Sequence, residues 1–301
     1  MAEQHTPQPG SAPRPGSAPR PEQHTPRSLI VTFYGAYGRG GEGPVPVAEL
    51  IRLLGAAGVD PPSVRSAVSR LKRRGLLVPA RTAEGAAGYA LSPGARQLLD
   101  DGDRRIYAGP APRRAGGWLL AVFSVPEHER HKRHLLRSRL AGLGFGTAAP
   151  GVWIAPDRLL EETRHTLERL ELSPYVDLFT GTHQGFEPTA RAVARWWDLQ
   201  ALAAMHRSFL DAHAPVLKRW EKAEKAGGVP AEAAYRDYLL ALDSWRHLPY
   251  ADPGLPGELL PPGWPGTRSA EVFLGLHRLL HSVGAEFVSA TPAGHPLRRS
   301  G

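Results

Sequence analysis

Residues 61–74 alternate between apolar and polar side chains with the period of a helix. At 100° per residue, Val64, Ala67, Val68 and Leu71 fall on one face. The remaining positions are mostly basic or serine, with Arg65, Ser66, Ser69 and Arg73 opposite the apolar face and Arg70, Lys72 and Arg74 on its flanks. The pattern predicts an amphipathic helix that buries its apolar face and turns a basic face outward.

Two shorter helices are predicted before this one. Residues 27–38 and 47–54 each carry apolar side chains at helical spacing. Asp60 is a suitable N-cap for the basic helix, and Pro61 and Pro62 suit its first turn. These signals fix where the basic helix begins.

Two strands and a fourth helix are predicted after it. Leu76–Val78 and Gly88–Leu91 are short apolar runs on either side of a glycine-containing tip. Ser92 is then a cap for a helix that runs to about Ile106. The order helix–helix–helix–strand–strand–helix is typical of a winged helix, in which the third helix reads DNA and the two strands form the wing.

The next segment alternates between strand and helix patterns. Strands are expected at 118–125, 145–149, 151–155 and 175–182. Helices are expected at 127–142, after the first strand, and at 157–171, before the last one. This β-α-β-β-α-β order predicts a ferredoxin-like unit.

From Thr189 onward the chain is predicted to be largely helical. Helices are expected over 189–225 with a break near Pro215, over 230–247, and over 269–283. The fold class is therefore α+β. We expect a disordered tail at 1–27 and a flexible tail at 291–301. Between them we expect a winged-helix DNA-binding domain at 28–109, a ferredoxin-like middle domain at 117–187, and a helical effector and dimerisation domain at 189–290.

Composition narrows the function classes. The 301 residues carry a formal net charge of +8 and have a sequence pI of about 10.0, which favours an anionic partner such as nucleic acid. The lack of cysteine excludes disulfides, thiolate nucleophiles and Cys-based metal sites. Because no apolar run is long enough to span a bilayer and no signal peptide is evident, we expect a cytoplasmic protein without a membrane partner.

The basic helix supplies the candidate contacts to double-stranded DNA. An α-helix fits the major groove, where Arg can donate two hydrogen bonds to guanine O6 and N7. Arg65, near the helix start, is the first candidate for reading a base. The predicted DNA-binding residues are Ser63, Arg65, Ser66, Ser69, Arg70, Lys72, Arg73, Arg74 and Arg81.

Different roles are expected within this set. The cations further along the helix are predicted to hold phosphate, which sets register rather than sequence. Arg81, at the wing, is placed to reach the neighbouring minor groove or its backbone. Two alternatives stay open: a basic face that is only solvated and, for Arg70, a structural ion pair.

A second basic helix carries three histidines. His128, His131 and His134 follow at three-residue spacing, so two of them could share a metal ion. The surrounding positive charge disfavours a cation, and a solvated helix face is the simpler interpretation. A third interpretation is that this helix binds the phosphate groups of a nucleotide-like ligand. We therefore predict no metal and no cofactor.

Four segments together resemble the phenylacetic-acid-degradation repressor family (PaaX-like regulators). They occur in the expected order, as VRSAVSRLKRRGLL at 64–77, WLLAVFSVPEHERHKRHLLRSRLAGLGFG at 118–146, GVWIAP at 151–156 and DPGLPGELLPPGWPG at 252–266. The resemblance covers roughly 28–290. It implies a homodimeric repressor of catabolic genes that an acyl-CoA, such as phenylacetyl-CoA, releases from its operator.

The resemblance also implies a middle domain shaped like the small CRISPR-associated nucleases. Those nucleases place a metal-binding aspartate near the end of their first strand, where this chain has Ser124. Without that carboxylate a two-metal phosphodiesterase centre is hard to build. We therefore predict no catalytic residues and no enzymatic activity.

An acyl-CoA effector needs an apolar slot for its acyl group and cations for its phosphates. The C-terminal unit supplies those residue types at Arg195, Trp196, Trp197, Trp245 and Arg246. The alternative is that the aromatic residues among them are core of a helical domain.

These observations predict a sequence-specific transcriptional regulator that binds operator DNA as a homodimer and responds to a small molecule. Two rival classes remain: a nonspecific architectural DNA binder and a metal-dependent nucleic-acid-processing enzyme.

Overall fold

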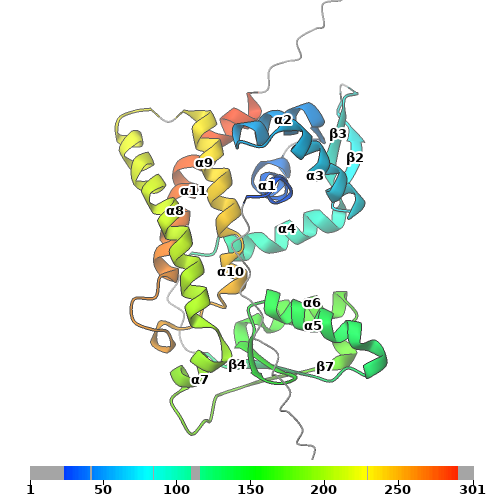
Figure 1. The fold of residues 1–301 in the computed structure, drawn as a ribbon, viewed down its shortest axis with the longest axis vertical. Helices are drawn as coiled ribbons and strands as arrows, with labels where there is room; N and C mark the ends of the chain where they lie inside the picture. Colours follow the sequence, from blue (N-terminus) through cyan, green and yellow to red (C-terminus); the bar gives the residue numbers. More distant parts are fainter. Residues whose placement is uncertain (1–23, 41–42, 84, 110–115, 229, 291–301) are drawn as a thin grey trace, which may run out of the picture.

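The computed structural model describes residues 24–40, 43–83, 85–109, 116–228 and 230–290. Most of the predicted disordered tail 1–27 (residues 1–23) and the predicted flexible tail 291–301 lie outside these residues. The boundary at residue 27 is wrong, because the first helix begins at Pro26 with Thr25 as its N-cap, and His24 contacts the Asp243 carboxylate. The described chain mixes helices with two antiparallel sheets, as the α+β prediction requires. Figure 1 shows an N-terminal part and a sheet-containing middle part, both attached to a column of long helices.

The N-terminal part contains four helices and a small sheet. Its elements are α1 (Pro26–Phe33), a π-helical turn (Tyr34–Gly38), β1 (Val45–Pro46), α2 (Val47–Ala56), α3 (Pro61–Arg73), β2 (Leu77–Arg81), β3 (Ala87–Leu91) and α4 (Pro93–Ile106). The three strands lie in the order β1-β3-β2. The predicted elements are all present, with ends shifted by a few residues, and β1 is an additional strand.

The middle part is built on a four-stranded sheet of order β5-β6-β4-β7. Its elements are β4 (Trp118–Phe123), α5 (Arg130–Gly142), β5 (Gly146–Ala149), β6 (Val152–Pro156), α6 (Leu160–Arg169) and β7 (Val176–Gly181). Short 3₁₀ turns precede both helices. Alternate strand residues such as Leu119 and Ala121 face a core that includes Leu140 of α5.

The opposite face of this sheet is only partly covered. Trp118 and Ile154 pack against Val193 of α7 (Thr189–Trp196). Further along the same face, Val122 and Phe179 remain 36% and 57% exposed. This end of the sheet face therefore exposes apolar side chains to solvent, beside Asp177, which pairs with Val122 across the strands.

The C-terminal part is helical, but its first break differs from the prediction. Its long helices are α8 (Leu199–Lys225), α9 (Ala231–Trp245) and α11 (Gly266–Ser289), with the short α10 (Leu248–Ala251) between the last two. Pro215 lies inside the continuous α8, and the chain instead turns at Trp197 and Asp198. The break expected near Pro215 is wrong, because residues on both sides of it in α8, among them Phe209 and Trp220, are buried in one core. The helix breaks instead at Trp197, whose backbone is extended and whose side chain is buried.

The N-terminal and C-terminal parts share one core. Leu29 and Phe33 of α1 belong to the same buried cluster as Tyr235 and Leu239 of α9, and α1 lies between α9 and α3 in Figure 1. A second cluster joins α8, α9 and α11. Among the described residues, no helix combines the length and apolarity needed to cross a bilayer.

Candidate nucleic-acid interface

Helix α3 is held by its apolar face and by defined ends. Val64, Val68 and Leu71 are buried against α1 and α2. The Asp60 carboxylate accepts a hydrogen bond of 2.9 Å from the Ser63 amide at the N-terminus of the helix. Hydrogen bonding from the Ser63 side chain and from its amide lowers the pKa of Asp60. Gly75, at φ +70°, ends the helix in the left-handed conformation that favours glycine. These interactions orient the outer face of α3.

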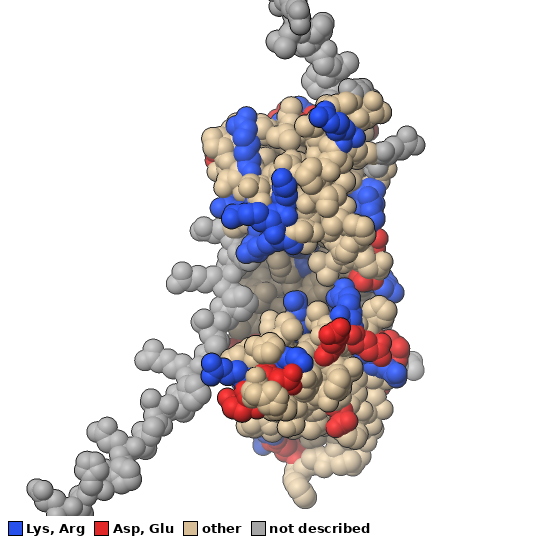
Figure 2. All heavy atoms as spheres, turned by 90° about the vertical axis from the view of Figure 1, so that its right-hand side faces the viewer, with Lys and Arg blue, Asp and Glu red and all other residues tan. Residues whose placement is uncertain are grey.

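That outer face is basic and exposed. Ser63 is half-buried, because it takes part in the cap, whereas the other predicted residues of the helix and its C-terminus are exposed, namely Arg65, Ser66, Ser69, Arg70, Lys72, Arg73 and Arg74. Figure 2 shows Lys and Arg gathered on this part of the molecule, with no Asp or Glu beside the largest group. Positive charge concentrated in this way attracts a polyanion.

None of the cations on α3 is neutralised within the described residues. The ion pairs of the described chain involve other arginines, and Arg70 in particular has no acidic partner there. The structural ion pair considered for Arg70 is therefore not present. A cation without an internal partner remains free to contact phosphate.

The strands after α3 are held by short contacts with Tyr34, with β1 and within their own hairpin. Tyr34 donates a hydrogen bond of 2.7 Å to the carbonyl of Tyr89 in β3. Gly88 lies so close to β1 that a Cβ atom would come within 2.6 Å of the Val45 carbonyl oxygen. Arg81, the last residue of β2, is exposed and donates a 2.8 Å hydrogen bond to the carbonyl of Gly85.

The five predicted effector residues do not form one site. Arg195 is exposed and pairs with Glu187. Trp196 and Trp197 pack with Trp118 against the sheet, and the Trp197 indole donates a 3.0 Å hydrogen bond to the Gly144 carbonyl.

The other two predicted effector residues lie in α9 and at its C-cap. Trp245 is buried, stacks on Phe273 and donates a 2.8 Å hydrogen bond to the Ile106 carbonyl. Arg246 donates to the Asp243 carboxylate at 3.3 Å and to the Ser28 hydroxyl at 2.7 Å. Of the five residues, Trp245 lines the cavity described next.

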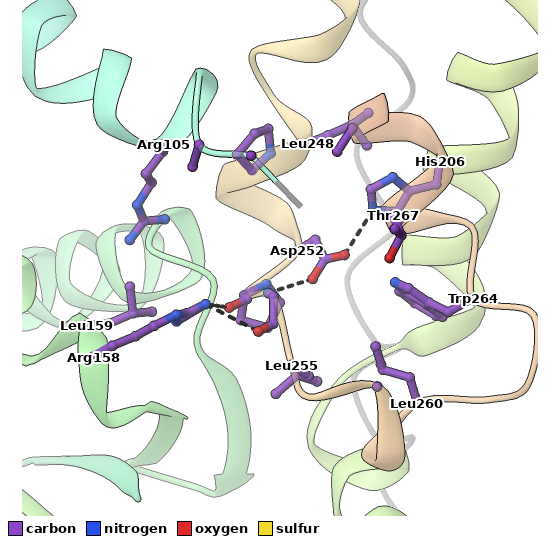
Figure 3. A pocket seen from close by; sticks show the side chains of 18 of the residues that line it. Arg105, Arg158, Leu159, His206, Leu248, Asp252, Leu255, Leu260, Trp264 and Thr267 are labelled. Carbon is purple, nitrogen blue, oxygen red and sulfur yellow. Dashed lines mark hydrogen bonds and ion pairs between the residues drawn. The ribbon is translucent and has the colours of Figure 1, made fainter. Parts of the chain in front are cut away.

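A cavity of about 630 Å³ lies where α4, the start of α6 and the C-terminal helices meet. Figure 3 shows His206 of α8 and Asp252 facing one another in its wall, with 2.9 Å between His206 Nε2 and Asp252 Oδ2. Burial alone would raise the pKa of Asp252, but hydrogen bonds from His206 and from the Gly254 amide outweigh it and lower the pKa.

Sequence reasoning missed this His–Asp pair. The two residues are 46 positions apart, so local spacing carries no signal for their contact. One sequence feature did point to this region: Asp252 and Trp264, which both contact His206, belong to the segment DPGLPGELLPPGWPG on which the family resemblance rests.

The geometry gives little support to a metal site at the three histidines or to a nuclease centre at Ser124. His128, His131 and His134 are exposed, and no group of three or more His, Cys, Asp or Glu able to hold a metal occurs in the described part of the chain. Ser124 follows β4, and its amide donates to the carbonyl of Tyr175.

Comparisons with family models and with a curated protein point to the same family. Family models described as PaaX-like protein, PaaX protein central Cas2-like domain and PaaX-like protein C-terminal domain match residues 25–95, 111–193 and 197–290. The curated Transcriptional repressor PaaX of Escherichia coli (strain K12) is 27% identical over 267 residues, which cover 87% of this chain and 82% of the relative.

A solved structure shares the fold. An uncharacterized protein from Mycobacterium tuberculosis is 23% identical, with a TM-score of 0.55 over 88% of this chain and 99% of that one. Neither the family models nor the curated relative describes an enzyme, in agreement with the expected lack of catalytic activity. Three consecutive family models together match most of the chain, and the chain therefore belongs to the PaaX-like family.

Proposed function

We propose that this protein is a sequence-specific, DNA-binding transcriptional repressor. The observation that carries the proposal is the exposed face of α3, whose cations have no acidic partner among the described residues. In this proposal residues 28–109 act as a winged helix, 117–187 as a ferredoxin-like unit and 189–290 as the effector and dimerisation unit. The name of the E. coli relative, a transcriptional repressor, supports the same function.

In the proposed complex, α3 enters the major groove by its N-terminal half. Arg65 then faces base edges, with Ser66 and Ser69 beside it, while Lys72 and Arg74 contact phosphate. Arg81 lies beside the wing tip and reaches the adjacent backbone. Two recognition helices would occupy successive major grooves about 34 Å apart, as expected of a two-fold symmetric dimer.

The Arg65→Ala variant tests the assignment of base reading. We expect a loss of about 1–3 kcal/mol that is confined to one base position, because bidentate contact with guanine is base-specific. Binding to a selected operator and to its single-base-pair variants, measured by fluorescence anisotropy, gives this pattern. The matched change Arg70→Ala should weaken all duplexes alike. An equal loss on every duplex for Arg65→Ala would favour the nonspecific architectural binder.

We propose that the protein acts as a homodimer and that the open end of the middle sheet contributes to the interface. Val122 and Phe179 are exposed apolar side chains there, and Phe186, in the loop that follows β7, is fully exposed. Apolar side chains gathered on a sheet face are typical of a protein–protein contact.

Replacing both Val122 and Phe179 with Asp is expected to convert the dimer to a monomer, because two charges would be buried on each side of the contact. Light scattering coupled to size-exclusion chromatography measures the change. Operator affinity should fall as well, since two half-sites are no longer held together. The control Leu98→Asp changes an exposed apolar residue of α4, and it should leave the dimer intact. A dimer that survives the double change excludes this face.

We further propose that an acyl-CoA such as phenylacetyl-CoA is the effector. Release of DNA requires that the ligand bind the DNA-incompetent form more tightly than the competent one. Selection of bound sequences from a randomised DNA library, with and without phenylacetyl-CoA, tests both claims together. Enrichment of one motif that the ligand abolishes is the expected result. DNA cleavage in magnesium or manganese would instead favour the nucleic-acid-processing enzyme.

A further inference from the structure

The large cavity is bounded by all three parts of the molecule. Its walls come from the end of α4, the start of α6, helices α8 to α11 and the loop after α10. A volume of about 630 Å³ lies within the range of about 300–1,000 Å³ typical of small-molecule sites. We propose that this cavity is the effector site and that it receives the acyl end of a coenzyme A thioester, an inference that rests on the proposed function.

The apolar part of the cavity lining suits an acyl group. Its lining includes two aromatic and several aliphatic side chains, namely Trp245, Leu248, Leu255, Leu260, Trp264 and Ala270. Figure 3 shows Leu248, Leu255, Leu260 and Trp264 around the space. An aromatic or aliphatic acyl group would bury its surface against these side chains, and such burial drives binding.

His206, which lines the cavity, has a buried polar atom that no other group in the described part of the chain hydrogen-bonds. His206 is 3% exposed; its Nε2 faces Asp252, while its Nδ1 is buried without a hydrogen-bond partner among the described residues. An unsatisfied buried polar atom costs free energy. A polar group of the ligand can satisfy Nδ1, which accepts a hydrogen bond as neutral imidazole and donates one as imidazolium.

Cations lie on the side of the cavity away from His206. Arg104 and Arg105 of α4 and Arg158, just before α6, all contribute to its lining. Arg104 is largely exposed and pairs with Asp101. The Arg105 guanidinium pairs at 2.7 Å with Glu162, which also lines the cavity, and lies 5.0 Å from the centre of the Tyr250 ring. Arginine is well suited to phosphate, so the phosphate groups of a coenzyme would be expected at this side.

The cavity is also placed to transmit binding to α3. Helix α4 follows β3 directly, and its end is held by hydrogen bonding of Trp245 to the Ile106 carbonyl. Arg158 of the middle part donates to the carbonyl of Pro253 on the opposite wall. A ligand that fills the space contacts elements from both parts, so it can bias their relative position and hence the spacing of two recognition helices.

Two neighbouring substitutions in α11 test the location. Thr267 lines the cavity and Arg268, the next residue, is exposed outside it. We compare Thr267→Trp with Arg268→Trp, which add the same side chain inside and outside the cavity. Calorimetric titration with phenylacetyl-CoA should show a roughly tenfold or greater loss of affinity for Thr267→Trp, and affinity for Arg268→Trp should stay near that of the unmodified protein. Both variants should retain operator binding without ligand, which shows that they fold.

The possible results distinguish an error in the location of the site from an error in the proposed effector function. If the unmodified protein binds phenylacetyl-CoA and Thr267→Trp binds it equally well, the effector function stands and this location is wrong. If the unmodified protein binds neither phenylacetyl-CoA, phenylacetate nor coenzyme A, the effector function fails and the site with it. The Arg104→Ala variant should weaken phenylacetyl-CoA and free coenzyme A but not phenylacetate; an equal effect on all three contradicts the assignment of the arginine side to phosphate.

Discussion

Replacing Lys72, Arg73 and Arg74 with glutamate is expected to weaken operator binding about 100-fold or more at physiological salt. These three residues are exposed at the C-terminal end of α3 and its cap. Each phosphate that a cation neutralises releases counterions and adds about 0.9 to the slope of log affinity against log salt concentration. Loss of three such contacts should lower the slope by about 3 and the affinity by a factor of about 100 or more.

The control for this experiment makes the same charge reversal at three lysines on the far side of the molecule. Lys218, Lys222 and Lys225 are exposed on α8, which lies across the structure from α3 in Figure 1. Their replacement with glutamate changes the net charge equally. Operator binding titrated at several salt concentrations should show a small loss from the lower net charge, with an unchanged slope. A slope that also stays unchanged for the α3 variant would mean that this face does not touch DNA.

The features that sequence predicted well are those encoded by neighbouring residues. The apolar positions of α3 are buried as expected, because helical periodicity alone determines which side chains share a face. Asp60 and Ser92 cap their helices through hydrogen bonds to the amides of Ser63 and Ala95. Such signals operate over three or four residues and survive in any tertiary context.

The features that sequence did not predict depend on contacts between distant segments. Pro215 removes one helical hydrogen bond, yet α8 continues through it because Phe209 and Trp220 on either side are buried in the core. The turn occurs at Trp197, whose indole is drawn to the Gly144 carbonyl 53 positions away. The pairing of His206 with Asp252 has the same origin, and residue type alone could not locate it.

The predicted effector residues illustrate the same limit. Aromatic and basic residue types suggested a site at Trp196, Trp197 and Arg246, but tertiary packing separates them. Trp245 alone of the five lines the large cavity. Arg246 instead takes part in a buried polar cluster that joins α1 to α9.

That cluster, centred on Asp243, is expected to control stability. Asp243 is 2% exposed and accepts hydrogen bonds of 2.6 Å from Ser28 and 2.7 Å from Thr32, both on α1. Arg246 and His24 also contact its carboxylate. Asp243→Ala should lower the free energy of unfolding by about 3 kcal/mol or more, because it leaves buried donors and a cation without their acceptor.

Urea unfolding at neutral pH measures this loss against a matched surface change. Asp100 is half-exposed and pairs with Arg39, so Asp100→Ala should cost less than about 1 kcal/mol. Equal losses for the two variants would contradict the importance of the buried cluster.

The same carboxylate gives the stability a defined pH dependence. Burial alone would raise the pKa of Asp243, but the hydrogen bonds from His24, Ser28 and Thr32 and the charge of Arg246 lower it to about 2. Because an unfolded aspartate has a pKa of about 3.9, the carboxylate adds roughly 2–3 kcal/mol of stability at neutral pH.

That contribution is fully present above about pH 5 and is lost as the pH falls through 4 toward 2, since the folded pKa is the lower one. Asp243→Asn cannot titrate, so the stability difference between it and the unmodified protein should stay constant from pH 7 to 5 and narrow below pH 4. Urea unfolding at each pH gives this difference. A difference that did not narrow at low pH would mean that the ionised carboxylate is not what holds α1 against α9.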